Sequence, residues 1–153
     1  MARWPQGSMT NFMAGLFVDT WGWLALRDKG DRRHREAATA FDEALSAKAL
    51  VVTTDYVLDE TFTLLFRRLS VHKARESLEA LMAAADHGAF ELATINAARF
   101  HEAVRLRLKY RDKPEISFTD FTSMVVMQES GVKRILTEDR HFAQVGMGFE
   151  LMP

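Results

Sequence analysis

Residues Gly15-Leu16-Phe17-Val18-Asp19 form a short apolar run that ends directly on a carboxylate. A run of this kind is typical of a strand that is buried on both faces of a parallel sheet. Similar runs recur along the chain and predict strands at 15–18, 50–53, 90–93, 134–136 and 149–152. The recurrence indicates a sheet of about five short strands.

Amphipathic stretches separate these runs and predict helices at 31–47, 55–69, 71–86, 97–111 and 119–130. In the second stretch, apolar residues repeat at helical spacing and form one stripe, made of Leu58, Phe62, Leu65 and Leu69. Short buried strands that alternate with helices are typical of the α/β class. We therefore expect a twisted, mostly parallel sheet flanked by helices.

A chain of 153 residues with 48% apolar composition can build one hydrophobic core. We expect a single domain over residues 12–153, preceded by an irregular segment at 1–11 whose Gly7-Ser8-Met9 junction is typical of a cloning scar. No apolar run approaches the ~20 residues that cross a bilayer, and no leader pattern is present, so we expect a cytoplasmic protein.

Cysteine is absent, which excludes thiolate metal sites and cysteine nucleophiles. Any metal must therefore be held by oxygen or imidazole ligands. The formal net charge is −1, so an affinity for nucleic acid has to come from local patches of charge.

Three aspartates stand where a predicted strand ends or a predicted helix begins. Asp19 directly follows the first strand, Asp139 closely follows the strand at 134–136, and Asp120 opens the helix at 119–130. In open α/β sheets these positions border the ligand crevice beyond the carboxyl ends of the strands. We expect the three carboxylates to converge there.

Glu60 is expected to join them from the helix at 55–69. Its helical neighbours are mostly apolar, and a carboxylate on an apolar flank is costly unless it is paired or bound to a cation. Four convergent carboxylates repel one another unless a divalent cation compensates their charge. Hard oxygen ligands of this kind suit Mg²⁺ or Mn²⁺, which support phosphodiester hydrolysis.

A structural interpretation exists for each acid taken alone. An aspartate at the end of a strand is more often a turn or helix cap than a metal ligand. Asp120 also gains stability from the helix dipole without any function. The argument for a metal site therefore depends on the joint occurrence of the acids at rim positions of one small domain.

Four blocks carry a resemblance to a known family, namely Phe17-Val18-Asp19-Thr20, Tyr56-Val57-Leu58-Asp59-Glu60, Ile116-Ser117-Phe118-Thr119-Asp120 and the stretch from Ile135 to Phe142 that contains Thr137-Glu138-Asp139-Arg140-His141. In this order they resemble PIN domains, especially the VapC-like toxins of prokaryotic toxin–antitoxin pairs. The resemblance covers nearly the whole chain, from about Phe12 to Met152.

The resemblance implies an endoribonuclease that uses Mg²⁺ or Mn²⁺. It assigns Asp19, Glu60, Asp120 and Asp139 as the four catalytic and metal-binding acids. It also implies an RNA substrate, a homodimer and a cognate antitoxin that docks at the acidic groove. Thr119 and Thr137 resemble positions that orient neighbouring acids by hydrogen bonds, whereas we treat Ser117 as structural.

Two acidic pairs leave alternatives open. Asp59 and Glu60 are rotated by about 100° from each other on a helix, so one of them faces the site, and we favour Glu60. Glu138 and Asp139 compete in the same way, and we favour Asp139. His141 is interpreted as loop packing, and the other histidines are interpreted as surface residues.

Basic clusters at 27–35 and 105–113 can bind a phosphate backbone, although such runs are more often solvated helix faces. Trp21 and Trp23 are interpreted as core or dimer surface rather than as a base-stacking platform. A phosphotransferase of the haloacid-dehalogenase type needs a second aspartate two residues after Asp19, where Trp21 stands. The serious alternative to a nuclease is a PIN-like module that binds RNA or a protein without cutting.

Overall fold

The computed structural model describes residues 15–153, so the predicted segment at 1–11 lies outside the described residues. The strands are β1 (Leu16–Val18), β2 (Val51–Thr54), β3 (Glu91–Ala93), β4 (Arg134–Leu136) and β5 (Glu150–Met152). The helices are α2 (Thr20–Arg27), α3 (His34–Ser46), α4 (Asp55–Arg68), α5 (Val71–Asp86), α6 (Ala97–Lys109), α7 (Phe118–Ser130) and α8 (His141–Gln144). The α/β class and the flanked sheet are confirmed.

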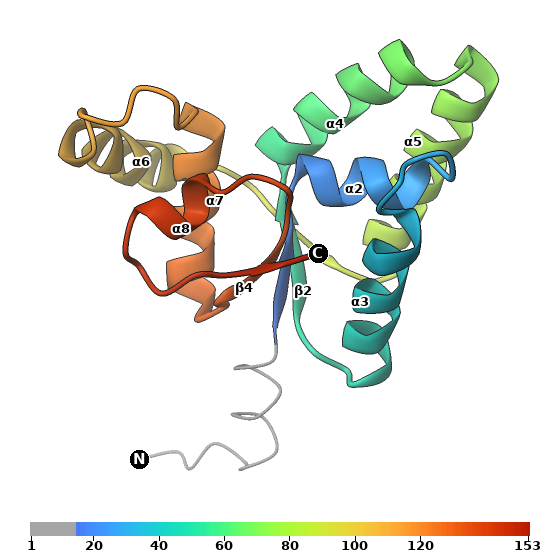
Figure 1. Ribbon diagram of the computed structural model, residues 1–153, viewed down its shortest axis with the longest axis horizontal. Coiled ribbons are helices and arrows are strands. Elements are labelled where there is room, and N and C mark those ends of the chain that lie inside the picture. Colours follow the sequence, from blue (N-terminus) through green and yellow to red (C-terminus); the bar gives the residue numbers. More distant parts are fainter. Residues whose placement is uncertain (1–14) are drawn as a thin grey trace.

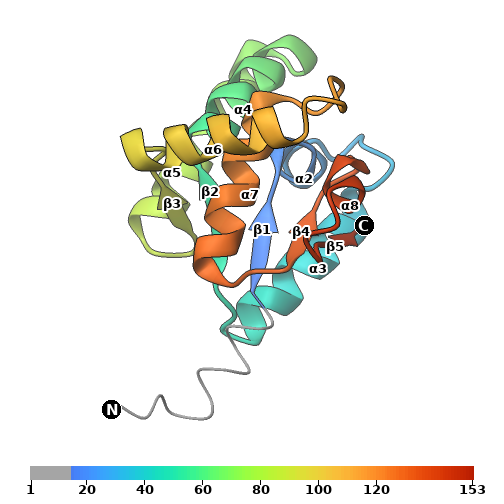
Figure 2. The ribbon, with the colours of Figure 1, turned by 90° about the vertical axis from the view of Figure 1, so that its left-hand side faces the viewer.

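The sheet has the order β3-β2-β1-β4-β5, and every neighbouring pair is parallel. β1 therefore lies in the centre, between β2 and β4 (Figure 2). Leu16 pairs with Val51 on one side, and Val18 pairs with Leu136 on the other. A central parallel strand is covered by helices on both faces of the sheet, which is why β1 is wholly apolar and buried at every residue.

Helices cover the sheet from two sides, with α6, α7 and α8 on one side and α2, α3 and α5 on the other (Figure 1). The core is densest beneath α7, where every residue from Phe121 to Met127 is buried. On the opposite side, the indole of Trp23 packs against the ring of Phe90, with ring centroids 4.8 Å apart, and donates to the hydroxyl of Thr53 at 3.1 Å. Among the described helices none is long and apolar enough to span a membrane.

Two helices were not predicted from the sequence. α2 follows Asp19 immediately, and its residues are buried on most sides, so it lacks the polar face that marks an amphipathic helix. α8 has four residues, too few to show a helical period. The helix predicted at 31–47 begins later, at His34, because the carboxylate of Asp31 accepts a hydrogen bond from the Arg33 amide at 2.8 Å and forms a turn.

Gly22 allows α2 to lie against the sheet. A Cβ atom at this position would meet the carbonyl oxygen of Leu136 at 2.7 Å and Cγ1 of Val18 at 2.9 Å. Backbone atoms cannot move aside as side chains do, so Gly22 is required for the close approach of the helix that follows Asp19.

We expect Gly22→Ala to lower the free energy of unfolding by about 1–3 kcal/mol, because overpacking outweighs the gain in helix propensity. Urea denaturation of the purified protein measures the change. Gly30→Ala is the matched control, since a Cβ atom there meets only the flexible carboxylate of Asp28, at 3.2 Å. Equal stability of the two variants would contradict this account of Gly22.

Candidate metal centre

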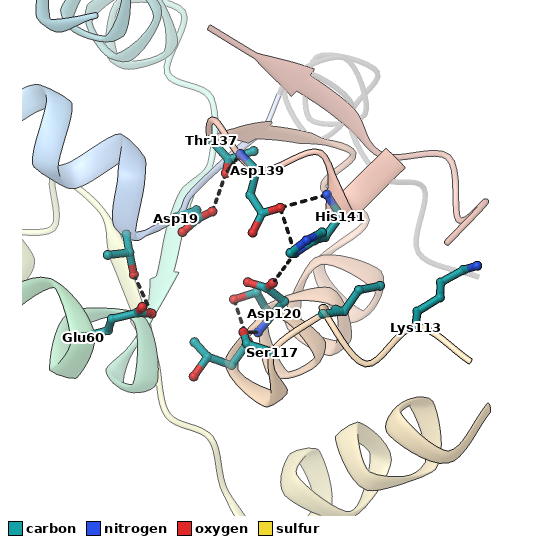
Figure 3. A network of polar contacts seen from close by, with 12 residues as sticks. Asp19, Glu60, Lys113, Ser117, Asp120, Thr137, Asp139 and His141 are labelled. Atoms are coloured by element: carbon teal, nitrogen blue, oxygen red, sulfur yellow. Dashed lines mark hydrogen bonds and ion pairs between the residues drawn. The ribbon is translucent and has the colours of Figure 1, made fainter. Parts of the chain in front are cut away.

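The carboxyl ends of β1 and β4 and the first turn of α7 bring Asp19, Asp139 and Asp120 together (Figure 3). Asp19 is the residue that caps α2, and Asp139 lies in the loop between β4 and α8. Asp120 is held at the start of α7, where its amide donates to the hydroxyl of Ser117 at 3.0 Å. The rim position that the sequence predicted for these three acids is thus where the structure places them.

Asp19 is the most buried member of this group, with 6% of its surface exposed. Burial raises the pKa of its carboxyl from 3.8 to about 7, and the negative charges of Asp120 and Asp139 add to the rise. A hydrogen bond from the hydroxyl of Thr137 to Oδ2 of Asp19, at 2.5 Å, opposes that rise in pKa. The protein therefore holds Asp19 in place while making its ionisation costly.

The pKa of Asp120 is raised for similar reasons. Burial is the main cause that raises its pKa from 3.8 to about 6, and the charge of Asp139 contributes. The imidazole of His141 lies with Nδ1 3.3 Å from Oδ2 of Asp120 and lowers the pKa in part. The carboxyls of Asp19 and Asp120 thus both bind a proton more tightly than an ordinary aspartate does.

Asp139 is fixed by the loop that carries it. Its amide donates to the hydroxyl of Thr137 at 2.9 Å, and its Oδ1 accepts from the amide of His141 at 2.9 Å. The ring Nδ1 of His141 lies 2.8 Å from the same oxygen. Thr137 is therefore the link between two acids, since it donates to Asp19 and accepts from Asp139.

Glu60 approaches from α4 on the side of Asp19 (Figure 3). The buried hydroxyl of Thr20 donates to its Oε2 at 3.2 Å. The side chain is otherwise exposed, so the apolar surroundings that we expected for Glu60 are wrong. The carboxylate extends beyond the apolar flank of α4 to the open edge of the site.

The structure separates the two ambiguous pairs of acids. Asp59 is exposed and makes no side-chain contact with the cluster, whereas Glu60 is tied to Thr20. Glu138 points away from the cluster and forms an ion pair with Arg33 at 3.1 Å. Glu60 and Asp139 are therefore the members of each pair that face the site.

Two further expectations differ from the structure. The side chain of Thr119 forms no hydrogen bond within the described part of the chain, so it does not orient an acid there as the resemblance implied. His141 was interpreted as loop packing, yet its ring contacts both Asp120 and Asp139. The ring reaches the two acids only because the folded chain brings the start of α8 against α7, so no local sequence pattern predicts this contact.

Thr20 was not singled out from the sequence either. Its place directly after Asp19, in the first turn of a helix, is the one available signal, because hydroxyl side chains commonly form hydrogen bonds at such positions. Arg107, in the second basic cluster, has a structural role. Its guanidinium donates to the carbonyl oxygens of Tyr110, Lys113 and Ile116 and fixes the loop that leads to Ser117.

The three aspartates offer the carboxylate oxygens that a hard cation prefers. Ligand atoms of Asp120, Asp139 and His141 all lie within 4.8 Å of one another, and Asp19 adds its charge to theirs. No lysine or arginine in the described residues pairs with Asp19, Asp120 or Asp139. A divalent cation would supply the compensating charge that these carboxylates lack.

Comparison with known proteins supplies relatives for this fold and this cluster. The sequence profile of the PIN domain matches residues 16–147. The 23S rRNA-specific endonuclease VapC20 of Mycobacterium tuberculosis is 33% identical over 136 residues, which span 86% of this chain and 94% of that protein. The ribonuclease VapC26 of the same species is 33% identical over 129 residues, spanning 84% and 90%.

Solved structures agree with the fold. The crystal structure of M. tuberculosis VapC20, described as a sarcin–ricin loop cleaving toxin, superposes with a TM-score of 0.69 at 32% identity and covers 86% of this chain and 95% of its own. VapBC2 of Rickettsia felis, bound to a promoter DNA fragment, has a TM-score of 0.68 at 12% identity, with 90% and 96% covered. At that identity the likeness concerns the fold alone. With a family profile over most of its length and relatives at 33% identity, this chain belongs to the PIN-domain family.

Proposed function

We propose that Asp19, Glu60, Asp120 and Asp139 hold a divalent cation, Mg²⁺ or Mn²⁺, with which this protein cuts RNA. The protein is a ribonuclease of the VapC type, as are relatives that match most of its length. The observation that carries the ligand assignment is the burial of Asp19 against two further carboxylates without a lysine or arginine partner in the described chain. Such an arrangement is costly unless a cation binds.

When bound, the cation compensates the carboxylates, stabilises charge on the phosphate and acidifies a water molecule. The chain itself positions the donors. Thr137 links the carboxylate of Asp19 to the backbone of Asp139 through two hydrogen bonds. Thr20 keeps Glu60 at the edge of the site, and His141 holds Asp120 beside Asp139. We assign these three as positioning residues, because each acts through a carboxylate.

The substrate that we propose is a single-stranded or looped RNA. VapC20, at 33% identity, is named for 23S rRNA, and its structure is described as cleaving the sarcin–ricin loop. An RNA stem-loop of that sequence is therefore the first substrate to test. Glu60 is exposed, so an RNA strand can reach the edge of the site that this side chain forms.

We also propose that the protein is the toxin of a toxin–antitoxin pair and that it forms a homodimer. Relatives named VapC and solved VapBC assemblies of the same fold support the first proposal. An exposed apolar line on α6, formed by Phe100, Val104 and Leu108, offers a surface that a second copy can cover.

We expect Asp120→Asn to lower the rate of RNA cleavage by roughly 100-fold or more, since the variant removes one of the charged donors. The assay incubates the stem-loop with protein and Mg²⁺ or Mn²⁺ and resolves the fragments on a gel. EDTA is expected to stop wild-type cleavage. Asp59→Asn is the matched control and should cleave RNA like the wild type, and full activity of Asp120→Asn would refute the assignment of this donor.

The raised pKa of Asp19 predicts a pH-dependent loss of stability in EDTA. Because the folded protein holds this proton up to about pH 7 and the unfolded chain only to about 3.8, the stability of the folded state falls as pH rises between these values. Above pH 7 the buried carboxyl of Asp19 is ionised, and its full destabilising effect on the folded protein is present. Asp19→Asn removes it and should stabilise the metal-free protein at pH 8 by on the order of 1–4 kcal/mol.

Thermal unfolding at pH 5 and pH 8 measures this effect, with the exposed Asp59→Asn as control. The gap between Asp19→Asn and wild type should be larger at pH 8 than at pH 5. Added Mg²⁺ or Mn²⁺ should raise the wild-type melting temperature and have little effect on Asp19→Asn. If the difference in melting temperature between Asp19→Asn and wild type does not change with pH, the pKa of Asp19 is not raised as described.

The proposed homodimer predicts a molar mass of twice 17.4 kDa in size-exclusion chromatography with light scattering. The mass should persist in EDTA, because the apolar line on α6 does not include the acids. A mass of 17.4 kDa at micromolar concentration would exclude a stable homodimer and leave the nuclease proposal unaffected.

A further inference from the structure

A hollow of about 510 Å³ lies beside the acidic cluster and carries the opposite charge. It is formed where the segment before α3 meets the loop between β4 and α8 and the end of β5. The residues that supply its polar groups are Arg32, Arg33, Thr137, Glu138 and Arg140. We call it the arginine hollow.

The arginine hollow and the acidic cluster share one loop. Thr137 lines the hollow, and its hydroxyl also donates to Asp19 and accepts from the amide of Asp139. Arg140 lines the hollow and directly follows Asp139. A ligand in the hollow is therefore next to the acids, with residues 137–140 as the wall between them.

The charges in the hollow are unbalanced. Of its three guanidinium groups, that of Arg33 pairs with Glu138 at 3.1 Å. The side chains of Arg32 and Arg140 are exposed and have no ion pair or hydrogen bond within residues 15–153. Guanidinium groups bind phosphate through paired N–H donors, so two free groups facing one hollow favour an anion of that shape.

We propose that the arginine hollow binds a backbone phosphate of the RNA, next to the phosphodiester that is cut. This inference rests on the ribonuclease function proposed above. A cluster of four carboxylates repels a polyanion, and the whole chain, at a net charge of −1, has no general attraction for one. A positive surface that shares a loop with the acids offsets this repulsion where the strand has to pass.

Glu138 limits how strongly the hollow can bind a phosphate. It is the one acidic side chain among the residues that line it, and its ion pair occupies Arg33. Removal of this carboxylate frees a third guanidinium, so Glu138 and the arginines should have opposite effects on RNA binding. This opposition separates an electrostatic role from a loss of folded protein, which would weaken binding in every variant.

The test measures the dissociation constant of a fluorescein-labelled sarcin–ricin stem-loop by anisotropy, with Asp120→Asn as the background that prevents cleavage. Arg32→Gln and Arg140→Gln should each weaken binding roughly threefold to tenfold. Each should also reduce the slope of log affinity against log salt by about 0.7, the value for one lost phosphate contact on a single strand. Glu138→Gln should tighten binding.

Arg75→Gln is the matched control, because Arg75 is an exposed arginine on α5 outside the hollow. It should leave both the affinity and the salt slope unchanged. In cleavage assays with intact Asp120, Arg32→Gln and Arg140→Gln should raise KM and leave kcat nearly unchanged, as expected for residues that bind the strand away from the reacting bond.

Unchanged affinity and salt slope in both arginine variants would overturn the proposal. The same result is expected if the hollow receives an acidic segment of a protein partner instead of RNA. The outcomes also distinguish the two proposals. If wild-type protein cuts no RNA with either metal, the ribonuclease function fails. If it cuts RNA while the arginine variants bind like Arg75→Gln, the arginine hollow alone is refuted.

Discussion

Repulsion among the carboxylates of Asp19, Asp120 and Asp139, at the end of the central strand, is the interaction that the rest of this domain has to withstand. Asp19 has 6% of its surface exposed, and burial together with two like charges raises its pKa to about 7. A carboxyl in this setting would relax away from its neighbours if the backbone allowed it. The remaining structure prevents that movement, so the repulsion among the carboxylates persists until a cation binds.

Two features of the fold supply this rigidity. β1 is flanked on both sides by parallel strands, and the hydroxyl of Thr53 donates to the carbonyl of Val18 at 2.8 Å, immediately before Asp19. Asp120 lies in the first turn of α7, whose residues from Phe121 to Met127 are buried, so this helix cannot shift without disrupting the core. The acids are thus set by the most constrained segments of the chain, whereas Glu60 stands on an exposed part of α4.

The sequence predicted the sheet and the rim acids because both depend on local pattern. Short apolar runs mark buried strands, and an acid directly after such a run must lie at the carboxyl edge of the sheet. α2 was missed because a helix that is buried on most sides has no polar face to reveal its period. The contacts of Thr20 and His141 were missed for another reason, since each joins segments that only the folded chain brings together.

Separation of charge across the loop at 137–140 resolves an apparent contradiction in the composition. A nuclease has to approach a polyanion, yet this chain has 20 basic and 21 acidic residues and no net attraction for one. Thr137 and Asp139 direct one side of the loop toward the acids, and Glu138 and Arg140 line the arginine hollow on the other. Four consecutive residues therefore contribute to a negative and a positive surface within one small site, and Thr137 belongs to both.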